Sequence, residues 1–135
     1  MPAIAFTVDG DPVAQPRPRV TTRGGHGHAY TPAGHAIHGY RQAVAVAAKA
    51  AGCEPHDQAV RVVIDLVFGR PKSHLRSSGE PKPSAPTLPR PDVDNAAKAV
   101  LDSLNGIAWV DDSQVSRLVV EKSYGTKGRT TVRIT

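Results

Sequence analysis

Acidic residues are concentrated in one short part of this 135-residue sequence. Five of its twelve acids lie in the segment 92–112, which contains a single basic residue, Lys98. The five are Asp92, Asp94, Asp102, Asp111 and Asp112. Neighbouring carboxylates repel one another unless a cation or basic side chains neutralise them. Because Mg²⁺ is bound through carboxylate and water oxygens, the cluster favours a divalent metal site.

The spacing around Asp92 suggests how such a site would form. Arg90-Pro91 biases the backbone toward an extended conformation, in which side chains two residues apart point to the same side. Asp92 and Asp94 are therefore predicted to converge. Lys98 falls one turn into a following helix, so its ammonium can reach the same volume and bind a phosphate or stabilise transition-state charge.

A third ligand is expected from Asp111 or Asp112. The turn at Gly106 can return residues 109–115 beside the start of the next strand, with Trp109 and Val110 anchored in the core. Adjacent residues on an extended segment point in opposite directions, so one of the two aspartates faces the site. Spacing alone does not choose between them.

Each of these residues also has a purely structural interpretation. Asp94 is a typical N-cap, Asp111-Asp112 is a typical turn, and Lys98 with Asp102 is a typical surface ion pair. Taken singly, each alternative is as good as a catalytic role. Together, DxDNxxK followed by WxDD in a basic chain favours chemistry.

The segments PDVDNAAKAVLDSLNG and WVDDSQV resemble the signature of the RusA family of Holliday-junction resolvases. The resemblance implies a homodimeric, Mg²⁺-dependent endodeoxyribonuclease of DNA recombination and repair, often from phages or prophages, that nicks four-way junctions on two opposing strands. Mn²⁺ would substitute for Mg²⁺. Asp92 and Asp94 match the motif aspartates, Lys98 the motif lysine, and Asp112 the third acidic catalytic residue.

The resulting hypothesis is a metal held by Asp92, Asp94 and Asp112 that activates water for in-line attack on a phosphodiester, leaving a 5′-phosphate and a 3′-hydroxyl. One alternative is a nuclease for other substrates, such as flaps, forks or RNA. Another is a DNA-binding protein without catalysis, which explains the basic charge but not the clustered carboxylates.

The charge distribution agrees with a polyanionic partner. The segment 92–112 carries a net charge of −4, whereas the whole chain carries +5, so the remainder carries +9. This excess of positive charge attracts phosphates. Aromatic residues make up 4% of the chain, too few to stack single-stranded bases in series, so duplex or branched DNA is favoured. The predicted phosphate-binding residues are Arg17, Arg19, Arg23, Arg70, Lys72, Arg76 and Arg90.

Hydrophobic periodicity predicts a single α+β domain over residues 1–135, with element order β-α-β-α-β-β and both helices on one face of a mixed sheet. The strands are expected at 3–8, 59–68, 114–124 and 129–134. One helix is expected from Thr31-Pro32 to Gly52, and another over 95–105 with Asp94 as its cap. Residues 70–91 are predicted to be a mobile, Pro-rich basic loop.

The remaining features concern location and metal content. A lone Cys53, no CxxC pattern and no long apolar run favour a cytoplasmic protein without a membrane segment. His26, His28, His35 and His38 are more typical of polar filler in a loop than of a zinc site.

Overall fold

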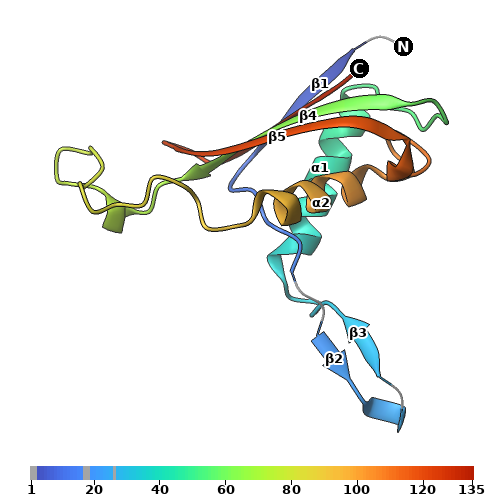
Figure 1. Cartoon of the computed structure of the whole chain (residues 1–135), viewed down its shortest axis with the longest axis horizontal. Helices are drawn as coiled ribbons and strands as arrows, with labels where there is room; N and C mark the ends of the chain where they lie inside the picture. Colours follow the sequence, from blue (N-terminus) through green and yellow to red (C-terminus); the bar gives the residue numbers. More distant parts are fainter. Residues whose placement is uncertain (1–2, 17–18, 26) are drawn as a thin grey trace.

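The computed structural model describes residues 3–16, 19–25 and 27–135, with the backbone alone for Arg19, Arg23 and His28. Its centre is a four-stranded mixed sheet in the order β1-β6-β4-β5 (Figure 1). The strands are β1 (Ile4–Asp9), β4 (Val60–Gly69), β5 (Val115–Gly125) and β6 (Arg129–Ile134). β4 and β5 are parallel and the other two pairs are antiparallel. The predicted α+β fold and mixed sheet are confirmed.

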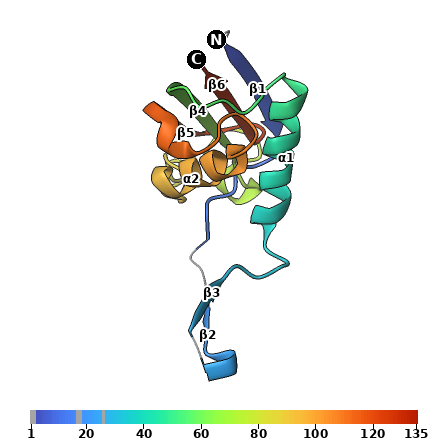
Figure 2. The ribbon, with the colours of Figure 1, turned by 90° about the vertical axis from the view of Figure 1, so that its right-hand side faces the viewer.

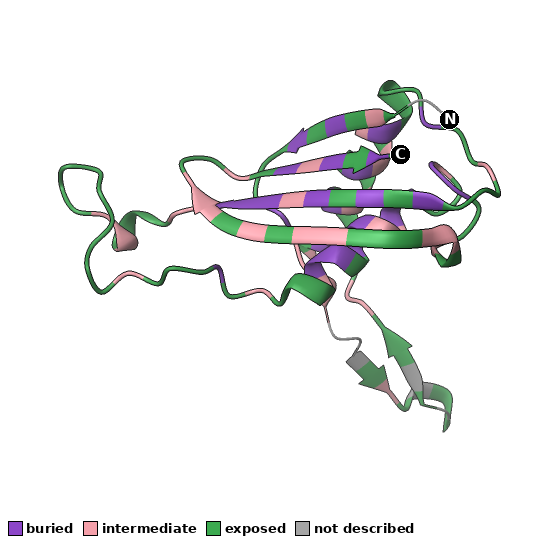
Figure 3. Cartoon of the chain, turned by 45° about the horizontal axis from the view of Figure 1, so that its top comes forward, coloured by how far each residue is buried: buried purple, intermediate pink, exposed green. Residues whose placement is uncertain are grey.

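Both helices, α1 (Ala36–Ala50) and α2 (Val93–Leu104), cover the same face of this sheet, as predicted (Figure 2). Alternation along the strands explains why one face is covered: β4 turns Val62, Ile64 and Leu66 toward the helices and Arg61 and Val63 away from them. Figure 3 shows this alternation of buried and exposed positions. The core therefore lies between the sheet and the two helices.

The two helices begin at different residues from those predicted. α1 begins at Ala36 rather than Thr31, because the Nδ1 atom of His35 accepts a hydrogen bond from the Ile37 amide and caps the helix. α2 begins at Val93, so the N-cap position belongs to Asp92 and not to Asp94. The extended backbone that was expected to run through both aspartates therefore ends at Asp92.

The connection after α2 is anchored by one of its two predicted core residues. Trp109 is fully buried, and its indole N–H donates to the Asn105 side chain at 2.8 Å. Val110 is 62% exposed, which corrects the prediction that it also anchors the core. The buried ring therefore anchors the return toward β5 in the core.

Two segments predicted to be loops contain additional structure. Residues 19–30 form a hairpin of β2 (Arg19–Thr21) and β3 (His28–Tyr30), with the 3₁₀ turn η1 (Arg23–Gly25) between them, and the hairpin projects from the body of the fold (Figures 1 and 2). The Pro-rich loop holds the 3₁₀ turn η2 (Lys72–His74) and a bridge between Leu75 and Pro81. Three-residue strands carry no usable periodicity, which is why the sequence did not indicate them.

No helix in the described part of the chain is long and apolar enough to cross a membrane.

Candidate functional site

Asp92 and Asp94 lie at the start of α2 with exposed side chains. Asp92 has extended backbone angles, φ −65° and ψ 138°, but its carboxylate makes no capping hydrogen bond. Within residues 3–16, 19–25 and 27–135, neither carboxylate has a hydrogen-bond or ion-pair partner. The positive end of the helix dipole stabilises negative charge here. Both groups are therefore available to a ligand rather than used to hold the fold.

Lys98 is one turn further along α2 and is engaged in a charged network. Its Nζ atom lies 3.6 Å from Oδ2 of Asp102, the surface ion pair that the spacing suggested. The same oxygen is 3.3 Å from Nη2 of Arg41 on α1, and Arg41 also donates to the side chain of Gln15. Asp102 thus links the two helices, while the Lys98 side chain is 60% exposed and open to further partners.

Asp111 and Asp112 have different surroundings. Asp111 caps the 3₁₀ turn η3 (Asp112–Gln114): its carboxylate accepts from the Ser113 amide at 3.1 Å. Hydrogen bonding to the side chain of Ser113, and then to its backbone amide, lowers the pKa of Asp111. The side chain of Asp112 is half-buried and makes no hydrogen bond or ion pair within the described residues. The geometry therefore gives Asp111 a structural task and leaves Asp112 free, a distinction that spacing alone did not make.

Gln114 is the residue of this turn that sequence reasoning missed. Its carbonyl oxygen accepts from the amides of Val110 and Asp111, at 2.8 and 3.0 Å. Its amide nitrogen donates to the carbonyls of His56 and Gln58, at 2.7 and 2.8 Å. One side chain thereby joins the start of β5 to the segment that precedes β4. The glutamine of the DDSQ motif holds the turn in place.

Asp92 and Asp94 both lie at the start of α2, and Asp112 does not, while the convergence of the first two carboxylates stays a prediction. α2 separates Asp112 from this pair: twelve helical residues span about 18 Å. η3 packs against the far end of α2, where the chain turns back toward β5 (Figure 1). In the part of the chain that the structure describes, no group of three or more acidic, His or Cys side chains could hold a metal ion.

Two carboxylates nevertheless fit Mg²⁺. This ion keeps several waters and is usually bound by one or two carboxylates together with substrate phosphate oxygens, rather than by a complete cage of protein ligands. The unpartnered oxygens of Asp92 and Asp94 are hard donors of the right kind. The start of α2 therefore supplies part of a metal site, to be completed by DNA or by another carboxylate.

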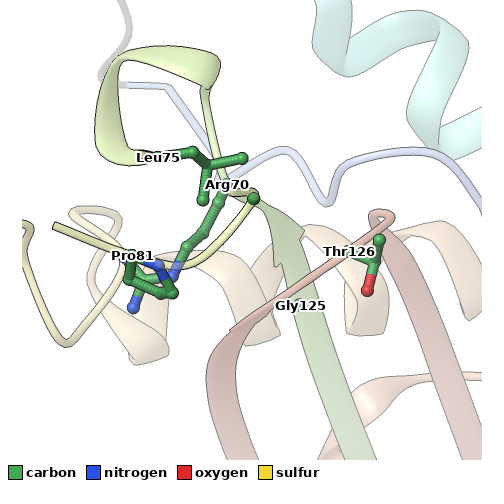
Figure 4. Close-up of a pocket in the computed structure, with 6 residues that line it drawn as sticks. Arg70, Leu75, Pro81, Gly125 and Thr126 are labelled. Atoms are coloured by element: carbon green, nitrogen blue, oxygen red, sulfur yellow. The ribbon is translucent and has the colours of Figure 1, made fainter. Parts of the chain in front are cut away.

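Several predicted phosphate-binding residues flank the loop before α2. The Arg70 guanidinium lies 4.3 Å from the centre of the Tyr124 ring and donates to the Pro86 carbonyl at 2.9 Å. Arg70 also lines a pocket of about 280 Å³ with Leu75, Pro81, Gly125 and Thr126, and none of the described residues that line it is acidic (Figure 4). Lys72, Arg76 and Arg90 are exposed.

Other sequence predictions fall on the hairpin and the start of α1. Arg17 and His26 lie outside the described residues, as do the side chains of Arg19, Arg23 and His28. His35 caps α1, and Nε2 of His38 lies 3.0 Å from the Pro32 carbonyl oxygen, so both rings have structural tasks.

Comparison with known proteins gives two matches. The family model described as endodeoxyribonuclease RusA matches residues 9–135. The uncharacterized protein YqaN of Bacillus subtilis (strain 168) is 36% identical over 139 residues, which cover 99% of this chain and 96% of that protein.

Proposed function

Because the chain belongs to the RusA family of endodeoxyribonucleases, we propose that it is a Mg²⁺-dependent enzyme that resolves Holliday junctions by paired nicks in DNA recombination and repair. One observation carries the metal-dependent part of the proposal. Asp92 and Asp94 present unpartnered carboxylates at one helix start, one turn from the exposed ammonium of Lys98. A polyanion-binding chain has no structural need for exposed acids there, since they repel DNA.

The roles of the residues follow from their positions. Asp92 and Asp94 would hold Mg²⁺, and Mn²⁺ would take its place through the same oxygens. When bound, the ion polarises a phosphate and lowers the pKa of coordinated water. Lys98 would bind the scissile phosphate from the same side of α2 and offset charge that develops on it. The helix N-terminus adds attraction for the phosphate.

The proposal includes a homodimer. Two nicks on opposing strands require two active sites, and one chain carries one DxDNxxK segment. The separation of Asp112 from Asp92 by the length of α2 supports the same conclusion. We propose that Asp112 of the partner subunit completes each site, as the third carboxylate beside Asp92 and Asp94.

DNA binding would use the basic residues on either side of the carboxylates. Arg70, Lys72, Arg76 and Arg90 line the segment that leads into α2. Arg17, Arg19 and Arg23 belong to the segment that contains the projecting hairpin. Contacts of this kind neutralise phosphates without reading sequence, which suits recognition of a branched shape.

A cleavage panel tests this function. Wild type and the variants Asp92→Asn, Asp94→Asn and Asp112→Asn would be assayed with Mg²⁺ on a four-way junction, a flap, a fork and a linear duplex of equal length. We expect the wild type to nick the junction and each variant to be at least about 100-fold slower, because each loses a charged metal ligand worth several kcal/mol. If the variants cut at wild-type rates, these aspartates do not form the active site. If the wild type prefers flaps or forks, those structures and not the four-way junction are its substrate. A wild type that binds junctions but never cuts them would be a non-catalytic DNA-binding protein.

Mixing the variants tests the shared site. Exchange of subunits gives mixed dimers with one Asp92→Asn subunit and one Asp112→Asn subunit. If each site takes Asp92 and Asp94 from one subunit and Asp112 from the other, one of the two sites in a mixed dimer carries both substitutions and the other carries none. Nicking of one strand should therefore return on mixing. If each subunit builds its own site, every site keeps one substitution and the mixture stays inactive.

A further inference from the structure

Lys122 is tied to the segment that leads into Asp92. Its Nζ atom, on β5, donates to the carbonyl of Pro89 at 3.0 Å and to the carbonyl of Pro91 at 2.8 Å. Pro91 is the residue directly before Asp92. A single ammonium therefore holds both ends of the tripeptide Pro89-Arg90-Pro91 at the point where the long loop becomes α2.

The composition of this tripeptide explains why a side chain is needed to hold it. Proline has no amide hydrogen, so residues 89 and 91 cannot donate to a neighbouring strand. Only their carbonyl oxygens are available to attach the segment to the sheet, and Pro89 is buried. The two proline carbonyls therefore need a donor from elsewhere, and an ammonium with three hydrogens can serve both at once.

The lysine itself is firmly placed. Its register partner on β4 is Leu66, which is fully buried on the helix-covered face of the sheet. Its neighbours on that face of β5, Val120 and Tyr124, pack against the core. Within the described residues Lys122 has no carboxylate partner, so its charged group serves the two carbonyls. The tether therefore joins the Asp92 segment to a strand that packs against the core.

We propose that Lys122 is a positioning residue for the metal-binding carboxylates, acting through the backbone that precedes Asp92. The inference rests on the proposed function, because it takes Asp92 to be a metal ligand. Among the described residues nothing hydrogen-bonds to the Asp92 side chain, so the placement of its carboxylate depends on how the chain enters α2. Partners that orient metal ligands typically contribute 10–100-fold to metal affinity.

The sign of the effect separates positioning from simple electrostatics. Lys122 carries a positive charge close to the proposed site, and by Coulomb's law removing it should strengthen the binding of a divalent cation. If the lysine instead fixes the chain before Asp92, removing it should weaken binding. The two explanations predict opposite changes in the dissociation constant for the metal.

The experiment measures Mn²⁺ binding to the full chain without DNA, from the electron paramagnetic resonance signal of free Mn²⁺. The variants are Lys122→Met, which keeps the length of the side chain but loses the donors, and Lys122→Arg, which keeps donors and charge. Lys127→Met is the matched control, since Lys127 is exposed in the turn after the same strand. Asp92→Asn tests the ligand itself, and thermal unfolding confirms that each variant is folded.

We expect Lys122→Met to bind Mn²⁺ about 10-fold more weakly than wild type, Lys122→Arg to recover part of that loss, and Lys127→Met to bind as wild type. Unchanged or tighter binding in Lys122→Met would overturn the proposal. If Asp92→Asn binds Mn²⁺ as wild type does, Asp92 is not a ligand, and the metal site and this role of Lys122 both fall. The Asp92→Asn variant thus distinguishes failure of the proposed metal site from failure of the positioning role of Lys122 alone. Should Lys122→Met not fold, Lys122→Gln, which removes the charge and shortens the donor, takes its place: equal or tighter binding by Lys122→Gln would refute the role.

Discussion

The Nζ atom of Lys98 lies 3.6 Å from Oδ2 of Asp102, one helical turn away from the carboxylates at the start of α2. The pair is exposed on the lysine side, so it contributes less than about 1 kcal/mol to stability. A lysine that matters little to folding is free to serve the reaction.

Replacing Lys98 should therefore separate activity from stability. We expect Lys98→Met to lower the single-turnover rate of junction cleavage by about 100-fold, because it removes a charge that offsets the developing transition-state charge. The free energy of unfolding in urea should change by less than about 1 kcal/mol. Lys49→Met, at an exposed lysine of α1, is the control. Full activity in Lys98→Met would exclude Lys98 from the site.

Substitutions of Asp111 and Asp112 should have opposite effects on stability and on cleavage. Hydrogen bonds from the side chain and then from the backbone amide of Ser113 lower the pKa of Asp111 below its ordinary value of 3.8. A depressed pKa means that Asp111 contributes stability above pH 3.8, and that this contribution is lost as the pH falls below it. Asp111→Ala should lower the melting temperature at pH 7 and retain cleavage.

Asp112→Asn should keep the melting temperature and lose cleavage. Calorimetry and the junction assay on both variants check the pair. Loss of activity in Asp111→Ala, with none in Asp112→Asn, would reverse the assignment.

Gln114 should be a stability residue despite its place in the motif. Gln114→Ala removes four hydrogen bonds to backbone groups. The Val110 amide and the His56 carbonyl still bond to each other, but among the described residues the Asp111 amide and the Gln58 carbonyl lose their partner, and we expect the free energy of unfolding to fall by about 2 kcal/mol. Urea denaturation measures the loss, and Gln42→Ala, at an exposed position of α1, should leave it unchanged. A Gln114→Ala protein of wild-type stability but without activity would point to a direct role in catalysis.

Tyr40 makes stability depend on alkaline pH. Its hydroxyl lies 2.6 Å from the buried Thr130 hydroxyl, and burial raises its pKa to about 12. Because the folded protein holds the proton more tightly than the unfolded chain, the contribution is complete below pH 10 and is lost as the pH rises toward 12. Between pH 9 and 11, wild type should lose about 1 kcal/mol more than Tyr40→Phe. Parallel urea curves at the two pH values test this difference, and equal losses would refute it.

Much of the fold could be predicted because its signals are local. The alternation of Val60, Val62 and Ile64 marks β4, and the spacing of Ile37, Tyr40 and Val44 marks α1. The clustered aspartates likewise pointed to the start of α2. What the sequence could not indicate are contacts made by single side chains over long separations, such as Gln114 with His56 and Lys122 with Pro91. No local pattern encodes such contacts.

The tether at Lys122 has a consequence for how this fold tolerates change in chain length. The loop before Pro91 ends at a fixed point on β5, so additional residues within 71–88 need not move Asp92. Doubling the length of a flexible loop costs only about 0.6 kcal/mol. Insertions and deletions can therefore accumulate in this segment while the entrance to α2 keeps its place, and proteins of this fold can acquire loops of different lengths around one unchanged pair of carboxylates.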